Sequence, residues 1–220
     1  MSDQRWLAAA WPVARALLPT PPARVLEIGC GQLGGFVPML RAAGYEAIGV
    51  DPEAPAGPDF VHSELELVEG LEGFHAAVAS TSLHHVADPA VAVDRVEAAL
   101  APGGRFVVLE WAWEELDEAT ARWGFARLSA GEDGWLAGQL DRWNESGQPW
   151  EAYFTRWAEG HGLHRADTLL RDLDRRFERT HAARGPYLFP ELDASEADER
   201  AAIEAGEIRA TRVDWAGLRT

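Results

Sequence analysis

The chain has 220 residues, 47% of them hydrophobic, which is enough to bury a sizeable core and excludes a disordered protein. Its formal net charge is −16, and none of its 20 basic residues is a lysine, which excludes a protein that binds nucleic acid through a basic surface. The single cysteine, Cys30, excludes an internal disulfide and a cysteine-cluster metal site.

Arginine, glutamate or proline interrupts every apolar run before it reaches the length that spans a bilayer. The N-terminus is amphipathic and has no signal-peptide cleavage pattern. We therefore expect a cytoplasmic protein of one domain, a monomer or a homodimer. We expect it to act on a small molecule, with no metal, membrane or nucleic acid as partner.

Within residues 24–109, short apolar runs alternate with helical stretches, which is typical of strand–helix–strand units on a parallel sheet. A helix over residues 1–20 precedes this segment. Strands are predicted over 24–28, 47–50, 59–62, 76–79 and 106–109. One helix is predicted over 36–43, and a second begins with Asp88 as N-cap and Pro89 as first helical residue and ends before a turn at 101–104.

The sequence changes character after Glu110, because seven of the ten tryptophans lie between Trp111 and Trp157. Four aromatic residues have the spacing of one helical face: Trp150, Tyr153, Phe154 and Trp157. This stripe is either a packing face or part of a lid over the edge of the sheet where ligands bind.

The C-terminal part is predicted to contain a helix over 167–180, a weak strand over 187–189 and a final strand over 208–215. We therefore divide the single domain, 1–220, into four parts. These are an N-terminal helix (1–20), a cofactor-binding core (23–110), a helical lid that binds the acceptor (111–165) and a C-terminal helix with a strand hairpin (166–220).

A glycine-rich turn lies between the first strand and the following helix. The run Gly-Cys-Gly-Gln-Leu-Gly at 29–34 matches G-x-G-x-x-G, and Asp51 ends the next strand. Glycines let the backbone approach a ligand closely, and the amides at the start of a helix bind a negative group. Taken literally, this pattern is the fingerprint of dinucleotide binding, so an NAD(P)-dependent oxidoreductase stays an alternative.

Glu27 favours a different ligand. It lies two residues before Gly29, near the ligand end of a central strand, where a carboxylate is costly unless it meets a cation or several donors. The amino group of a methionine moiety supplies such a cation, whereas a pyrophosphate repels the carboxylate.

Four short segments occur in a characteristic order: Val-Leu-Glu-Ile-Gly-Cys-Gly at 25–31, Val-Asp at 50–51, Ser-Leu-His-His-Val at 82–86 and Leu-Ala-Pro-Gly-Gly at 100–104. Together they resemble the class I S-adenosylmethionine-dependent methyltransferases. Within these, the chain is most similar to the methyltransferase type 11 subgroup, which includes the ubiquinone-biosynthesis C-methyltransferases and many enzymes of secondary metabolism. The resemblance covers about residues 23–110.

This resemblance implies an α/β fold: a Rossmann-like, seven-stranded, mostly parallel sheet with helices on both faces and an antiparallel C-terminal strand. It implies methyl transfer from S-adenosyl-L-methionine to a small-molecule acceptor, with S-adenosyl-L-homocysteine as product. The chain departs from the family at two places. The third glycine comes one position late, where Leu33 precedes Gly34, and His75 replaces the usual aspartate.

The resemblance also assigns cofactor-binding roles. The backbone of Gly29, Gly31 and Gly34 holds the methionine portion, and Glu27 favours its ammonium group. Asp51 binds the ribose hydroxyls. The adenine is expected to contact Pro52, Glu64 and Leu65, and Ser80 to contact the cofactor through its backbone.

Methyl transfer needs alignment of the acceptor and exclusion of water, and it needs a base only when the acceptor must lose a proton. His84 and His85 are the candidate bases, although one of them is equally expected to cap a helix or to pack. Glu110, Trp111 and Trp113 are expected to bind the acceptor, with Glu110 as a second candidate base. A protein that binds S-adenosylmethionine without transferring its methyl group is a third possibility.

Overall fold

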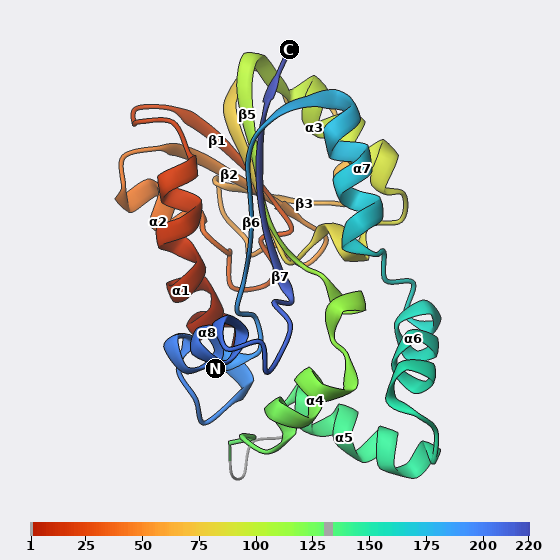
Figure 1. Cartoon of the computed structure of the whole chain (residues 1–220). Coiled ribbons are helices and arrows are strands. Elements are labelled where there is room, and N and C mark those ends of the chain that lie inside the picture. The colour runs from red at the N-terminus through yellow and green to blue at the C-terminus, as the bar shows by residue number, and fades with distance from the viewer. Residues whose placement is uncertain (1, 130–133) are drawn as a thin grey trace.

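The computed structural model describes residues 2–129 and 134–220. Its centre is a seven-stranded sheet in the order β3-β2-β1-β4-β5-β7-β6 (Figure 1). The strands β1 to β5 are parallel, and β7 is antiparallel to both β5 and β6. The Rossmann-like fold class predicted from the sequence is therefore confirmed. The strands are β1 (Arg24–Ile28), β2 (Glu46–Asp51), β3 (Phe60–His62), β4 (Phe74–Ser80), β5 (Leu100–Trp111), β6 (Phe177–Gly185) and β7 (Arg212–Arg219).

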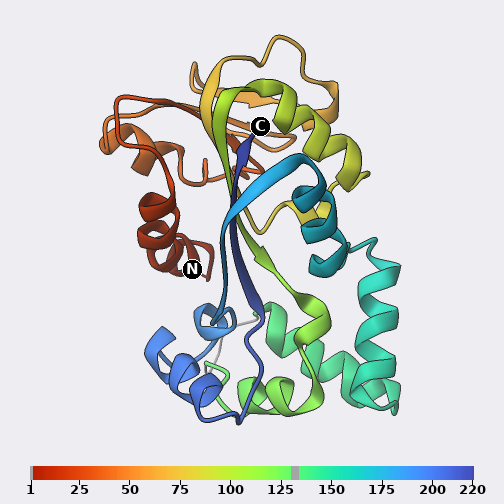
Figure 2. The same ribbon diagram turned by 45° about the horizontal axis from the view of Figure 1, so that its top comes forward.

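Helices cover both faces of the sheet, because successive residues of the buried central strands point to opposite sides. Val25 packs with α1 and α2 on one face, and its neighbour Leu26 packs with α3 and α7 on the other (Figures 1 and 2). Asp88 caps α3 by accepting the amides of Ala90 and Val91, as the sequence predicts. These helices are α1 (Ser2–Leu17), α2 (Val37–Ala42), α3 (Pro89–Ala99) and α7 (Ala166–Arg176).

Three further helices follow β5 and form a smaller lobe, which we call the lid: α4 (Glu118–Phe125), α5 (Trp135–Ser146) and α6 (Trp150–Gly160). The aromatic stripe of α6 fills the inside of this lobe. Trp150 is fully buried and stacks on Phe154 with a centroid distance of 4.7 Å. The stripe is thus a packing face of the lid's own core.

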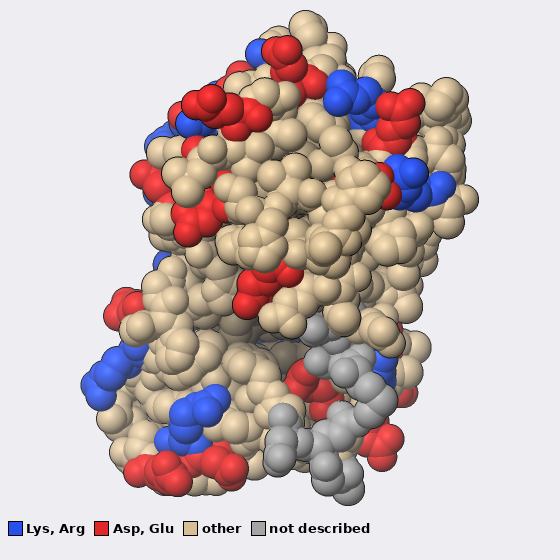
Figure 3. All heavy atoms as spheres, turned by 180° about the vertical axis from the view of Figure 1, so that it is seen from behind, with Lys and Arg blue, Asp and Glu red and all other residues tan. Residues whose placement is uncertain are grey.

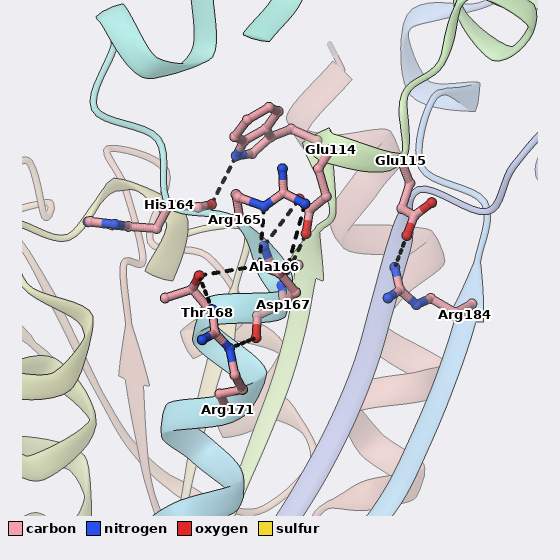
Figure 4. A network of polar contacts seen from close by, with 10 residues as sticks. Glu114, Glu115, His164, Arg165, Ala166, Asp167, Thr168, Arg171 and Arg184 are labelled. Atoms are coloured by element: carbon pink, nitrogen blue, oxygen red, sulfur yellow. Dashed lines mark hydrogen bonds and ion pairs between the residues drawn. The ribbon is translucent and has the colours of Figure 1, made fainter. Parts of the chain in front are cut away.

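Polar contacts fix the segment that follows β5 to α7 and to β6 (Figure 4). Trp113 donates its indole N–H to the carbonyl of His164 at 3.0 Å. Glu114 accepts hydrogen bonds from the first two amides of α7. Glu115 forms an ion pair with Arg184. In the described part of the chain, no helix has the length and apolarity needed to cross a membrane.

The structure corrects the sequence prediction in the C-terminal part. The predicted helix to residue 180 is wrong at its end, because α7 stops at Arg176 and Phe177 begins the edge strand β6. Most side chains of β6 are exposed on both faces, so the strand lacks the alternation that would reveal it; pairing with β7 determines it. The last strand lies four residues later than predicted, at Arg212–Arg219.

The weak strand predicted at 187–189 is also wrong: this segment is a loop that runs into a 3-10 turn, Phe189–Glu191. The loop is held by Glu199, whose buried carboxylate accepts the amides of Tyr187, Leu188 and Phe189. Glu199 belongs to α8 (Glu196–Glu204), a helix with a capping box that the sequence analysis did not predict.

Candidate functional site

A cavity of about 1080 Å³ lies at the carboxyl ends of β1, β2 and β4. Between β1 and β4 the strand order changes direction, and in open α/β sheets this is where ligands bind. Figure 3 shows the surface hollowed between the sheet and the lid. The volume is at the upper end of the usual range for ligand pockets, so the cavity has room for a cofactor and a second molecule.

The glycine turn forms the floor of this cavity. Gly29 has φ +75, and a Cβ placed on it would lie 2.1 Å from the Cβ of Ser82 at the end of β4. The hydroxyl of Ser82 donates to the carbonyl of Ile28 at 2.9 Å, which holds the two loops together. Only a glycine fits at position 29, because both the dihedral angle and the space exclude a side chain.

The late third glycine has a physical explanation. A Cβ on Gly35 would lie 2.2 Å from Oε1 of Glu27, and Gly35 lines the cavity. Gly34 packs instead against the ring of Phe60 and is not among the described residues that line the cavity. Of these two glycines, Gly35 and not Gly34 therefore belongs to the described lining of the cavity.

Glu27 is 1% exposed and lines the cavity. Its Oε1 accepts the amide of Phe36 at 2.8 Å, whereas its buried Oε2 accepts no hydrogen bond from the described residues. Burial raises the pKa of Glu27 to about 8, although the amides of Phe36 and Val37 favour the charged form. A buried oxygen without a donor, at the wall of a cavity, calls for a donor from a ligand.

Asp51, at the end of β2, faces the same cavity. Its Oδ2 accepts the amide of Gly31 at 2.9 Å, and its Oδ1 accepts the amide of Glu53 at 2.7 Å. The carboxylate thereby ties the glycine turn to β2 and remains accessible from the cavity. The predicted cofactor residues brought together in the lining are Glu27, Gly29, Gly31, Asp51, Pro52, Glu64, Leu65 and Ser80.

The two histidines after β4 lie in different surroundings. His85 lines the cavity, and burial, together with the neighbouring His84, lowers its pKa to about 4. His84 is 3% exposed, and its Nδ1 lies 2.5 Å from Oε1 of Glu110. Of the two candidate bases, the structure places His85 at the cavity and His84 behind it.

A family model described as a methyltransferase domain matches residues 4–176. The chain belongs to this methyltransferase family. No curated protein matches the chain by sequence.

Solved structures of methyltransferases share the fold of this methyltransferase. An S-adenosylmethionine-dependent methyltransferase from Mesorhizobium loti is 25% identical, with 96% of this chain and 98% of that chain covered and a TM-score of 0.59. A 1,6-didemethyltoxoflavin-N1-methyltransferase from Burkholderia thailandensis, solved with 1,6-didemethyltoxoflavin and S-adenosylhomocysteine, is 17% identical, with coverages of 97% and 79% and a TM-score of 0.56. The geranyl diphosphate C-methyltransferase of Streptomyces coelicolor A3(2) is 17% identical, with coverages of 97% and 77% and a TM-score of 0.54.

The residues expected to bind the acceptor lie behind the cavity wall in this methyltransferase. Glu110, Trp111 and Trp113 are buried and are absent from the described lining. Trp111 stacks on Tyr187 with a centroid distance of 5.4 Å and meets the edge of Trp135 at 5.0 Å. Their burial follows from the direction of β5, which carries the chain into the core of the lid.

The aromatic residues at the cavity were missed by sequence reasoning. They are Trp6 of α1, Trp135 of α5 and Tyr187 of the loop before the 3-10 turn. No local pattern marks them, because each lies on a different element and they meet only in the folded methyltransferase.

Cys30 is a buried packing residue, and His75 is a surface residue. Burial raises the pKa of the Cys30 thiol to about 12, which makes it a poor nucleophile in this methyltransferase. His75 is exposed and accepts the amide of Arg24 through Nδ1. Among the described residues, no group of three or more His, Cys, Asp or Glu side chains has the arrangement of a metal site.

Proposed function

We propose that this chain transfers a methyl group from S-adenosylmethionine to a small-molecule acceptor. The observation that carries the proposal is the buried Oε2 of Glu27, which accepts no hydrogen bond from the described residues and belongs to a side chain of the cavity lining beside the glycine turn. The ammonium group of the cofactor's methionine portion suits it, because a cation offsets the burial of a carboxylate. The complexes of solved relatives with S-adenosylhomocysteine support this choice of ligand.

The cofactor fits the rest of the lining as well. Backbone groups of Gly29 and Gly31 would hold the methionine portion, and Asp51 would accept hydrogen bonds from the ribose hydroxyls. Glu64 and Leu65, after β3, would contact the adenine. The described lining contains no arginine or lysine, so the pyrophosphate of NAD would face the carboxylates of Glu27 and Asp51 without a counter-ion.

The protein's own part in the reaction is positioning, exclusion of water and proton transfer. When bound, S-adenosylmethionine supplies a methyl group on a sulfonium centre that is already reactive. The lid and the loop before the 3-10 turn cover the cavity, with Trp135 and Tyr187 facing it. His85 is neutral at pH 7 because its pKa is about 4, so its ring is able to accept a proton or a hydrogen bond from the acceptor.

Asp51→Ala tests the cofactor site. Because hydrogen bonds to a charged acceptor contribute about 1.5–3 kcal/mol, we expect the substitution to weaken S-adenosylmethionine binding by about tenfold to a hundredfold. Isothermal titration calorimetry measures this, and Asp59→Ala is the matched control. Asp59 pairs with Arg41 outside the described lining, so its loss should leave the affinity unchanged.

An unchanged affinity of Asp51→Ala would remove the ribose assignment. A thermal-shift comparison of S-adenosylmethionine, S-adenosylhomocysteine, NAD and NADP separates the alternatives. A ligand that binds the folded protein raises its stability by an amount that grows with the ratio of ligand concentration to dissociation constant. Stabilisation by NAD alone would identify an oxidoreductase. Binding of S-adenosylmethionine without a methylated product from any acceptor would identify a protein that only binds the cofactor.

Glu27→Gln should change cofactor binding in a pH-dependent way. In the ligand-free protein the pKa of Glu27 is about 8, and an ammonium group beside it favours the carboxylate. The complex then holds fewer protons than the free protein, so the wild-type affinity should rise as the pH goes from about 6 to about 8. We expect Glu27→Gln to lose this rise and, at the upper end, to bind about tenfold more weakly.

The same substitution should stabilise the ligand-free fold. The folded pKa of Glu27 lies above the ordinary value of 4.5, so its stabilising contribution is present below about 4.5 and is lost as the pH rises to about 8. Glu27→Gln lacks this loss, so at pH 8 its free energy of unfolding should be about 2 kcal/mol higher than that of the wild type. Desolvation of the new amide limits the gain, and urea denaturation measures it. Equal stability of the two proteins across this range would contradict the burial of a neutral carboxyl group.

A further inference from the structure

One end of the cavity is left for the acceptor, and this inference rests on the proposed function. The cofactor residues follow β1, β2 and β3 on one side of the cavity. The remaining lining comes from elements outside these strands: Trp6 and Leu7 of α1, Trp135 of α5, and Tyr187, Leu188, Pro190 and Glu191. His85 and Ser82, after β4, also belong to the lining. We call the side with Trp6, Trp135 and Tyr187 the acceptor end.

Three aromatic residues line the acceptor end, and Trp111 behind them joins Tyr187 to Trp135. The ring of Trp6 meets the edge of Tyr187 at a centroid distance of 5.1 Å, and Tyr187 stacks on Trp111, whose edge meets Trp135. The indole N–H of Trp6 donates to the hydroxyl of Ser80 at 2.9 Å, which fixes this ring at the end of β4. Such a wall binds apolar or aromatic groups and attracts cations to the faces of its rings.

The charges at the acceptor end are negative. Glu191 lines the cavity there, half-buried, with its Oε2 3.5 Å from the amide of Leu136 at the start of α5. No arginine or lysine belongs to the described lining. An anionic acceptor would therefore lose its hydration without gaining a counter-ion.

The two arginines nearest this wall already have partners. Arg5 donates to the carbonyls of Pro190 and Leu192 at 3.0 and 3.1 Å. Arg212, on β7, is buried and forms an ion pair with Asp214 at 2.8 Å, behind the ring of Trp6. Neither guanidinium belongs to the described lining, and no ion pair joins either of them to Glu191 among the described residues.

We propose that the acceptor is an amine carried on an aromatic or apolar group, and that the protein methylates its nitrogen. Glu191 and the aromatic wall bind the ammonium form, which first loses one proton to solvent, and the neutral ring of His85 accepts a hydrogen bond from the amine. The lone pair of the amine nitrogen then forms the nitrogen–carbon bond. The carbon–sulfur bond breaks with its electron pair remaining on sulfur, and the product is an N-methylammonium ion. The positive charge passes from sulfur to nitrogen, and it stays within reach of the same carboxylate.

The experiment uses the full chain saturated with S-adenosylhomocysteine, whose own affinity is measured first. Three probes with one ring system and different charges are then titrated: tryptamine, tryptophol and indole-3-propionate. We expect tryptamine to bind about tenfold more tightly than indole-3-propionate, with tryptophol between them, because only the ammonium gains from Glu191 and the rings.

Two variants separate charge from packing. Glu191→Gln should reduce the affinity for tryptamine to about that for tryptophol and leave S-adenosylhomocysteine binding within about twofold, since the amide oxygen keeps the contact with Leu136. Trp135→Ala should weaken all three probes. Glu178→Gln removes the same charge from the exposed edge strand β6 and should change none of the affinities.

The outcomes distinguish the two proposals. Failure of S-adenosylhomocysteine to bind would overturn the proposed function itself. If it binds, an affinity for tryptamine no higher than for its two partners, including no binding by any of the three, overturns the amine inference and leaves the cofactor site standing. A preference for tryptamine that Glu191→Gln does not reduce also overturns it.

Discussion

Gly29→Ala should destabilise the fold by about 4 kcal/mol and abolish cofactor binding, because it combines a strained backbone with a clash. The residue has φ +75, where a side chain costs about 1–2 kcal/mol. The new Cβ would also lie 2.1 Å from the Cβ of Ser82, a separation that requires the loop after β4 to move. This loop has little freedom, because Ser82 is bonded to Ile28 and Thr81 already has φ +50.

Gly70→Ala is the matched control for this prediction. Gly70 has the same φ of +75, and nothing lies within 4 Å of a Cβ placed on it. We therefore expect only the backbone part of the effect, about 1 kcal/mol, and unchanged binding of S-adenosylhomocysteine. Urea denaturation of the two variants gives the difference, and equal losses of stability would show that the contact between the glycine turn and β4 is unimportant.

Glu110→Ala should destabilise the fold by about 3–5 kcal/mol, because it leaves several buried donors without their acceptor. Glu110 is 2% exposed, and its carboxylate accepts the amides of Leu83 and Trp111 at 2.9 and 2.7 Å. It also pairs with His84 at 2.5 Å. Its removal leaves three buried polar groups without their acceptor, beside the loop that carries His85.

The denaturation midpoint measures this effect, and Glu178→Ala, an exposed carboxylate on β6, should change the stability by less than about 0.5 kcal/mol. Glu110→Gln keeps one acceptor oxygen and should lie between the wild type and Glu110→Ala. If Glu110→Ala were as stable as the wild type but inactive, Glu110 would again be a candidate for the catalytic base, as the sequence analysis allowed.

The sequence was most informative where local rules determine structure. The apolar runs of β1 and β4 are buried on both faces, so their composition alone predicts parallel strands. The glycine turn and Asp51 follow directly from strand ends, and parallel strands bring their carboxyl ends to one edge of the sheet. For this reason Glu27, Gly29 and Asp51 were predicted together, and the structure places them in one cavity.

The sequence was least informative where residues far apart meet. Trp6 and Ser80 are 74 positions apart, yet their hydrogen bond forms part of the cavity wall. Glu110 and His84 were expected at the acceptor, but they contact each other and neither belongs to the described lining of the cavity. The first four residues of the edge strand β6, 177–180, were mistaken for helix because the exposed residues of this strand carry no periodicity.

By itself, the sequence determined the order of the sheet's first five strands along the chain, the glycine turn and the acidic residues beside it. Only the tertiary structure decided which aromatic rings reach the cavity and which of the two histidines faces it. The physical reason is the separation along the chain of the residues that interact. Strand burial, turns and caps depend on neighbours in the chain, whereas the wall of a cavity depends on the directions in which separate elements bring their side chains together.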